Sequence, residues 1–374
     1  MADPATSPPL NRASVQAARE LIAPYVHHTP TLTNRTLTEL GSTARTREEV
    51  LARGEGQWAK IDHPASPKLR LWFKCENLQR VGAFKARGAF HALGRLLEEE
   101  GALSLAARTH NVPAYIVMPE ISTPSKVAAT KGYGAKVIFS GSTSVEREAA
   151  AAKVIEETGA RLVPPYDHPD IVLGQGTLGL ELQEDAARMM AEQGQGQDQD
   201  QEGAGRKKVG LDAILAPCGG GGMLSGVALS CEGTGIRVFG CEPWYQGADD
   251  AKRGYESGAR VEAVSTLTVA DGLRTPLGKV PWHVIYERRL VSGFYSVSER
   301  EIRDALRLVL ERLKMVIEPS AAVPLAVALY NEDFRGMVER EAGEAGWDVG
   351  VVFSGGNVSL EALGKLFANA EEGK

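Results

Sequence analysis

The chain has few of the features that mark secreted proteins, proteins with structural metal sites or membrane proteins. Its 374 residues contain four cysteines, which lack the close paired spacing of zinc or dithiol sites and are too few for a dense disulfide framework. No apolar stretch is long enough to cross a bilayer, and the first residues lack the apolar core of a signal peptide. The sequence therefore predicts a soluble, cytoplasmic protein in a reducing compartment.

An excess of positive charge is also missing. The formal net charge is -6 and the pI is about 5.8, so no electropositive surface for a nucleic acid or an anionic membrane is expected. The seven histidines show neither metal-ligand spacing nor the context of a catalytic triad, and we assign none of them a role. Small molecules are the expected partners.

The length and the patterning predict an α/β protein with two lobes. A chain of this size exceeds what one hydrophobic core usually supports, and a cleft between lobes is then expected. From Lys85 onward, helical patterns alternate with short apolar runs, which indicates parallel strands joined by helices. The expected strands are 69–74, 114–118, 136–139, 213–216, 237–241 and 349–353.

Several segments are expected to lie outside this core. Residues 1–12 are rich in proline and small polar residues and predict a disordered lead-in, followed by a helix over 14–22 after a serine cap at Ser14. Residues 41–67 read as a surface insertion. Residues 193–205 are of low complexity, with too little apolar surface to offset the entropy of ordering, and predict a flexible loop.

Two short motifs carry chemistry. Lys85 follows Phe84 in a glycine-flanked turn after a predicted strand, where a lysine can form a Schiff base with a carbonyl cofactor. Far downstream, the run Gly219 to Gly222 supplies side-chain-free amides ahead of a predicted helix, which suits a phosphate. Taken singly, a solvated surface lysine and a flexible linker are common explanations. Together, a carbonyl and a phosphate site suggest pyridoxal phosphate.

With these motifs the chain resembles the fold-type II pyridoxal-phosphate enzymes, and within them the serine racemase and serine/threonine dehydratase family, from Ser14 to about Leu366. Several motifs in the family order are much more specific than any one of them. Besides the lysine and tetraglycine segments, the family-like runs are 268–272 (Thr-Val-Ala-Asp-Gly), 317–322 (Ile-Glu-Pro-Ser-Ala-Ala) and 352–357 (Val-Phe-Ser-Gly-Gly-Asn).

The resemblance implies a role for each matching residue. Lys85 resembles the Schiff-base lysine, and Phe84 the aromatic residue beside the cofactor ring. Ser354 resembles the residue that faces the pyridine nitrogen. The phosphate cup would be formed by Gly219, Gly220, Gly221, Gly222 and Met223.

The same resemblance implies the reaction. A hydroxyl such as that of Ser354 does not hold the pyridine nitrogen protonated as a carboxylate would, which favours elimination over transamination. The lysine amine, displaced by the substrate amine, would take the alpha proton, and loss of the beta hydroxyl would lead to pyruvate from serine or 2-oxobutanoate from threonine. Reprotonation from the opposite face would give racemisation instead.

A divalent-cation site is also implied. In the run 240–250, Glu242, the carbonyl of Ala248 and Asp250 resemble the family's ligands, and hard oxygen ligands suit Mg²⁺ or Ca²⁺. The spacing is about two residues longer than in the racemases. Without the resemblance, these acids would read as a solvated acidic surface.

One expected motif has no counterpart in the chain. Family members carry a Ser-Ser-Gly-Asn-His-like loop that holds the substrate carboxylate, but here residues 98–101 pass directly into 102–108, which resemble the helix after that loop. Either the loop is deleted or the gene model skips an exon. The clean return to the family register at Ala102 favours the second explanation, and a deleted central strand would leave unpaired backbone groups.

The expected division places residues 13–92 and 166–374 in a large cofactor-binding domain and 93–165 in a small one. The leading prediction is dehydration of a hydroxy amino acid, L-serine or L-threonine, with a racemase side activity, by a homodimer. Two alternatives stay open: a pyridoxal-phosphate-binding protein that is catalytically silent because it lacks the substrate loop, and a beta-replacement enzyme.

Overall fold

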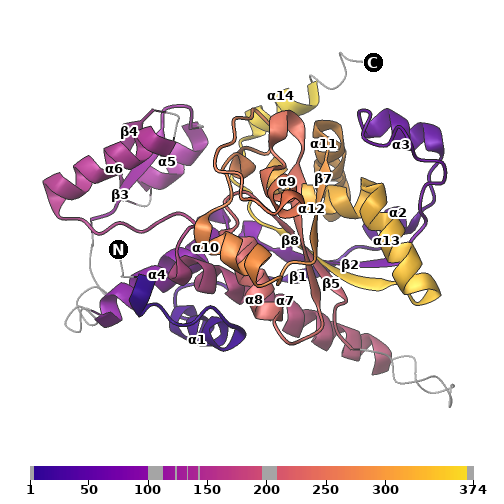
Figure 1. The fold of residues 1–374 in the computed structure, drawn as a ribbon, viewed down its shortest axis with the longest axis horizontal. Helices are drawn as coiled ribbons and strands as arrows, with labels where there is room; N and C mark the ends of the chain where they lie inside the picture. Colours follow the sequence, from indigo (N-terminus) through magenta and orange to yellow (C-terminus); the bar gives the residue numbers. More distant parts are fainter. Residues whose placement is uncertain are drawn as a thin grey trace.

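A six-stranded sheet forms the centre of the molecule (Figure 1). The computed structural model describes residues 4–99, 113–122, 124–132, 134–141, 144–195 and 209–368. The sheet order is β1 (Thr31–Thr33), β2 (Leu69–Cys75), β8 (Trp347–Phe353), β5 (Ala213–Pro217), β6 (Arg237–Pro243) and β7 (Gly293–Val297). All neighbouring strands are parallel except the edge pair β1 and β2. The predicted fold class, α/β with mostly parallel strands, is confirmed.

Helices cover both faces of this sheet. One layer contains α2 (Arg35–Ser42), α11 (Glu299–Leu308), α12 (Pro319–Tyr330) and α13 (Glu332–Ala342), with α14 (Leu360–Ala368) at its margin. The other contains α1 (Arg12–Ile22), α7 (Pro169–Gln195), α8 (Gly222–Cys231), α9 (Asp250–Ser257) and α10 (Lys279–Trp282). The helix α4 (Lys85–Glu99) packs against α1 and α7.

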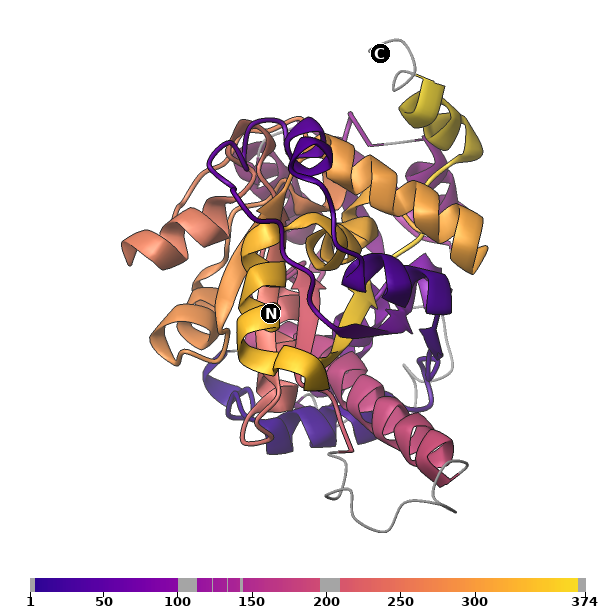
Figure 2. The ribbon, with the colours of Figure 1, turned by 90° about the vertical axis from the view of Figure 1, so that its right-hand side faces the viewer.

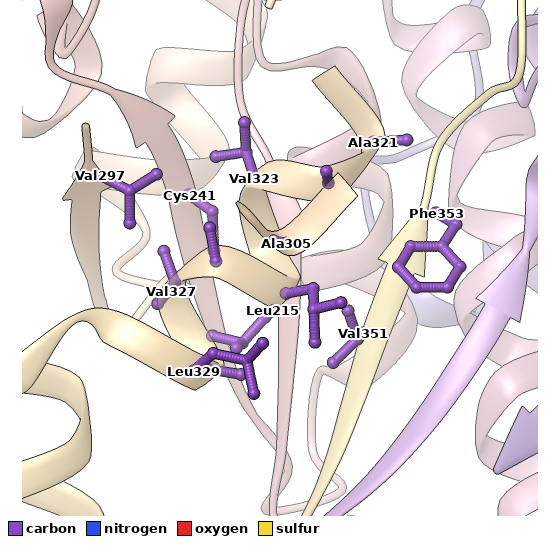
Figure 3. Packing of buried hydrophobic residues seen from close by; sticks show 14 of the residues in the cluster. Leu215, Cys241, Val297, Ala305, Ala321, Val323, Val327, Leu329, Val351 and Phe353 are labelled. Carbon is purple, nitrogen blue, oxygen red and sulfur yellow. The ribbon is translucent and has the colours of Figure 1, made fainter. Parts of the chain in front are cut away.

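The period-two alternation of the buried strands builds a separate core on each face. In β5, Leu215 belongs to the core under α12, whereas Ile214 and Ala216 belong to the core under α8. Figure 3 shows the first core from close by, with Leu215 of β5 next to Val351 of β8 and with Val327 on α12. Continuous apolar strands are therefore explained by burial on both sides.

A second, two-stranded sheet pairs β3 (Tyr115–Pro119) with β4 (Lys136–Ser140) in parallel. Together with α5 (Pro124–Gly132) and α6 (Ser144–Thr158), it forms a group drawn beside the main sheet in Figure 1. The elements fall within the range 93–165 expected for the small domain. The domain boundaries themselves stay a prediction.

The N-terminal expectations need correction. Residues 4–12 include a short helical turn, Pro4–Thr6, and the carbonyl of Leu10 accepts a hydrogen bond from Arg288, so this segment is anchored rather than disordered. The cap of α1 is Asn11, whose side chain accepts the amide of Ser14; Ser14 itself lies inside the helix.

The other two segments differ from the expectation in part. The segment 41–67 contains α3 (Arg47–Arg53) with a capping box at Thr46. In Figure 2 this indigo segment crosses the helical layer that contains α13. It is tied there: the amide of Ala65 donates to Glu332 at 2.7 Å. Of the expected loop 193–205, residues up to Gln195 belong to α7, and the rest lies outside the described residues, as does the expected return to family register at 102–108.

Candidate functional site

The candidate site lies where adjacent parallel strands end. In the sheet order, β2 leads to the Lys85 turn, β8 to Ser354, β5 to the glycine loop and β6 to Glu242. The carboxyl ends of neighbouring parallel strands share one edge, which is where open α/β sheets bind ligands. Sequence-distant motifs therefore meet because of strand order.

The Lys85 turn is fixed to the loop after β8. The amide of Phe84 donates to the carbonyl of Ser354 at 3.1 Å, and the amide of Gly356 donates to the carbonyl of Gly82 at 2.9 Å. Val81 has a φ of 57° and Gly82 a φ of 69°, so the chain reverses sharply before α4 begins. Lys85 is exposed at the first position of this helix, while Ser354 is buried.

The glycine loop is shaped by the absence of side chains. A methyl group added at Gly220 would lie 2.4 Å from the ring of Tyr166, and one at Gly219 would lie 3.1 Å from the carbonyl oxygen of Gly272. Gly221 has a φ of 84° and precedes α8, with Met223 in the first turn of that helix. The glycines are therefore required by close packing against Tyr166 and Gly272, and they leave a run of side-chain-free amides at a helix N-terminus, which fits a phosphate group.

The remaining family-like runs complete a chain of contacts. The amide of Gly272 donates to the hydroxyl of Ser320 at 3.0 Å. The amide of Glu318 donates to the carbonyl of Gly355, also at 3.0 Å. These contacts thus link neighbouring segments in space, from the glycine loop through the runs 268–272 and 317–322 to the Ser354 loop and the Lys85 turn.

The expected metal ligands are buried acids. Burial and the charge of Asp250 raise the pKa of Glu242 well above its usual value, and burial raises that of Asp250 to about 6. Glu242 accepts the amides of Ala251 and Lys252, and one oxygen of Asp250 accepts the amide of Leu277. The other oxygen of Asp250 is buried without a partner in the described chain.

This arrangement suits a hard cation, because a divalent ion would satisfy the orphaned oxygen and offset the repulsion of the two carboxylates. Ala248, whose carbonyl is the third expected ligand, is also buried. Within the described residues no group of three or more His, Cys, Asp or Glu side chains could hold a metal, and the expected set contains only two such side chains.

Sequence reasoning missed Tyr166 and Asp167. The Tyr166 ring packs over Gly220, and burial raises its pKa, so its hydroxyl stays protonated. The carboxylate of Asp167 accepts the amides of Lys279 and Val280 at 3.0 and 2.8 Å. Both residues precede α7 and brace the glycine loop and α10. The local sequence carries no distinctive signal, since their position depends on what the glycines leave open.

Cysteine chemistry is not part of this site. All four cysteines are buried and free, and burial raises the pKa of Cys218, next to the glycine loop, well above its usual value. A thiol of this kind is a poor nucleophile.

No helix in the described ranges is long and apolar enough to span a membrane.

Comparison with known proteins agrees with the geometry. A family model described as "Pyridoxal-phosphate dependent enzyme" matches residues 58–355. The chain belongs to this family. It is 36% identical to a serine racemase of Arabidopsis thaliana over 374 residues, covering 96% of each chain. It is 34% identical to an L-threo-3-hydroxyaspartate ammonia-lyase of Saccharomyces cerevisiae, covering 95% of this chain and 96% of the relative.

A solved structure of maize serine racemase superimposes with a TM-score of 0.73 at 32% identity, covering 97% of this chain and 98% of that one. The resemblance to fold-type II pyridoxal-phosphate enzymes is thus confirmed, and with it the cofactor. The roles assigned to individual residues stay predictions.

Proposed function

We propose that this enzyme deaminates a beta-hydroxy amino acid, L-serine, L-threonine or 3-hydroxyaspartate, to a 2-oxo acid and ammonia, with serine racemisation as a side reaction. The observation that carries the proposal is the fixed Lys85 turn: its Phe84 amide is bonded to Ser354, and its lysine is exposed at the edge that also carries the glycine loop. Relatives with both activities match the chain over nearly its full length.

Each residue has a distinct task in this proposal. Bound pyridoxal phosphate supplies a carbonyl for the substrate amine and an electron sink for the bond to the alpha proton. Gly219 to Gly222 and Met223 would hold its phosphate, Phe84 would lie beside its ring, and the hydroxyl of Ser354 would face its nitrogen. The amine of Lys85 would accept the alpha proton, this proton would balance the one that the beta hydroxyl takes up to leave as water, and addition of a second water would release ammonia and the 2-oxo acid.

We also propose that Glu242, Asp250 and the carbonyl of Ala248 bind Mg²⁺ or Ca²⁺, which stabilises the end of β6 beside the glycine loop. Support comes from the orphaned buried oxygen of Asp250. A cytoplasmic location and a homodimer complete the proposal, and they rest on the free cysteines and on the resemblance to the racemases.

A second candidate is a silent cofactor-binding protein. It is favoured by one observation, the lack of any Ser-Ser-Gly-Asn-His-like sequence between Lys85 and the glycine loop. Such a protein would retain the cofactor but lack the group that holds the substrate carboxylate.

Keto-acid release separates the two candidates. Purified holoprotein is incubated with L-serine, L-threonine and L-threo-3-hydroxyaspartate, and 2-oxo acid is measured, with Lys85→Ala as the inactive variant. Lys365→Ala, an exposed lysine paired with Glu361 on α14, serves as the matched control. Keto acid from the wild type and the control alone supports the lyase, and bound cofactor without keto acid supports the silent binder.

A further inference from the structure

A buried ionic cluster lies close in the chain to the candidate lysine. Arg87, two positions after Lys85, is 0% exposed. Its guanidinium donates from Nε and Nη2 to both oxygens of Glu76, each at 2.8 Å. It donates from Nη1 and Nη2 to both oxygens of Glu181, at 2.7 and 2.8 Å. One planar cation is therefore clamped between two carboxylates.

A second cation completes the cluster. Lys74, at 0% exposure near the end of β2, lies 2.7 Å from Glu181 and donates to the carbonyl of Thr29 at 2.6 Å. Burial alone would raise the pKa of Glu181, but the hydrogen bonds and charges of Arg87 and Lys74 outweigh it and lower that pKa. Glu181 therefore stays charged. The cluster joins β2, α4, α7 and the segment before β1.

Close helix crossings extend this frame to the glycine loop. A methyl group added at Gly174 of α7 would lie 2.7 Å from the carbonyl oxygen of Arg87, and one at Gly226 of α8 would lie 2.5 Å from the amide of Gly176. Thus the backbone of α4 packs directly on that of α7, and the backbone of α7 packs directly on that of α8. The helix α7 therefore helps to set the distance between the lysine at the start of α4 and the glycine loop at the start of α8.

We propose that Arg87 is a positioning residue for Lys85, with Glu76 and Glu181 as its anchors. This inference rests on the proposed role of Lys85 as the cofactor-binding lysine. The Lys85 turn is held on one side by the Ser354 loop, and Arg87 holds the other side by fixing the first turn of α4. Because reacting groups must be placed to within a fraction of an ångström, loss of this clamp slows attack of the lysine on the cofactor carbonyl.

The geometry requires arginine rather than a positive charge alone. A guanidinium presents a planar set of donors that meets two carboxylates at once, whereas an ammonium is a point charge with three donors. Arg87→Lys keeps the charge and loses the clamp. Arg87→Met would leave two buried carboxylates short of a cation and is expected to destabilise the fold. Glu76→Gln, which keeps the side-chain shape, provides the second informative variant.

The test measures formation of the covalent lysine adduct rather than turnover. Apoprotein is mixed with pyridoxal phosphate, samples are reduced with borohydride at intervals, and the adduct on Lys85 is quantified by peptide mass spectrometry. Melting temperature and cofactor retained without reduction are measured in parallel. Arg95→Lys, on the same helix and bonded to the carbonyl of Thr6, is the matched control.

We expect Arg87→Lys to form the adduct at least about tenfold more slowly, with noncovalent cofactor retention near that of wild type, and to have a lower melting temperature because two buried carboxylates lose donors. Glu76→Gln should change the rate in the same direction, and Arg95→Lys should match wild type. If Arg87→Lys does not fold, the Glu76→Gln rate decides. A wild-type rate in either folded clamp variant overturns this inference alone, whereas no Lys85 adduct in the wild type overturns the proposed function as well.

Discussion

The amide of Phe84 donates a hydrogen bond of 3.1 Å to the carbonyl oxygen of Ser354, which joins the turn before Lys85 to the loop after the strand β8. The residue proposed to lie beside the cofactor ring and the residue proposed to face its nitrogen are therefore fixed to each other by backbone atoms. Side-chain substitutions at either position should change the chemistry more than the placement of the loops.

The glycine loop should not tolerate a side chain. In Gly220→Ala the new methyl group would lie 2.4 Å from the Tyr166 ring, inside contact distance, so the ring or the loop must shift. We expect cofactor affinity to fall by at least about tenfold, as judged by equilibrium dialysis. Gly364→Ala in α14, where nothing lies within 4 Å, is the control and should leave cofactor affinity unchanged. Equal affinities in both variants would contradict the phosphate assignment.

The acidic pair should make stability depend on pH and on a divalent cation. The pKa of Asp250 is raised from 3.8 to about 6, so the folded protein binds this proton more tightly than the unfolded chain does. Its contribution to stability is full below pH 3.8 and is lost as the pH rises through about 6. Added Mg²⁺ should therefore raise the melting temperature more at pH 8 than at pH 5.

Asp250→Asn should remove most of this cation effect, and Asp249→Asn, which alters the neighbouring partner of Arg253, should retain it. Thermal unfolding with and without Mg²⁺ at both pH values checks the prediction. An equal cation effect in wild type and Asp250→Asn would exclude this site.

The contact between the segment 41–67 and Glu301 should make the stability of the fold depend on pH. Burial raises the pKa of this acid from 4.5 to about 7, and the indole nitrogen of Trp58 lies 3.5 Å from its carboxylate. The stabilising effect of the bound proton is present below pH 4.5 and lost as the pH rises to about 7. In Glu301→Gln the melting temperature should depend less on pH over that range. If the melting temperature of the variant changes with pH as steeply as that of wild type, the assignment to Glu301 is wrong.

Patterns of burial were readable from the sequence, but tertiary contacts were not. The apolar runs of β5, β6 and β8 predicted buried parallel strands because both faces of such strands are apolar. The strands β1 and β7 escaped prediction, since β1 is three residues long and β7, Gly293–Val297, mixes glycine and serine with apolar residues. Strand length and pairing partners override weak local patterns.

The candidate site was predicted in parts for a similar reason. The lysine, glycine and serine motifs are local and could be recognised. The buried clamp of Arg87 could not, because Lys74, Glu76 and Arg87 each look like surface charges until the fold buries them together. The one available signal was charge within the apolar run of β2 and directly after it.

The absence of the substrate-loop motif from this sequence can be tested on the natural protein. A tryptic digest of material from the native source should contain longer peptides with a Ser-Gly-Asn-His sequence, because the expected return to the family register at Ala102 favours a skipped exon. Trypsin cleaves after Arg95 and Arg108, so the sequence as written would instead give residues 96–108 as one peptide. Detection of that peptide alone would make the deletion real and favour the silent binder.

The most direct test of the account is to locate the covalent cofactor adduct. Holoprotein is reduced with borohydride, digested with trypsin and searched for phosphopyridoxyl peptides. We predict the label on Lys85 within the peptide 81–87, which stays intact because the modified lysine is no longer cleaved. A label on any other lysine, or none in protein that retains its cofactor, would contradict the central claim.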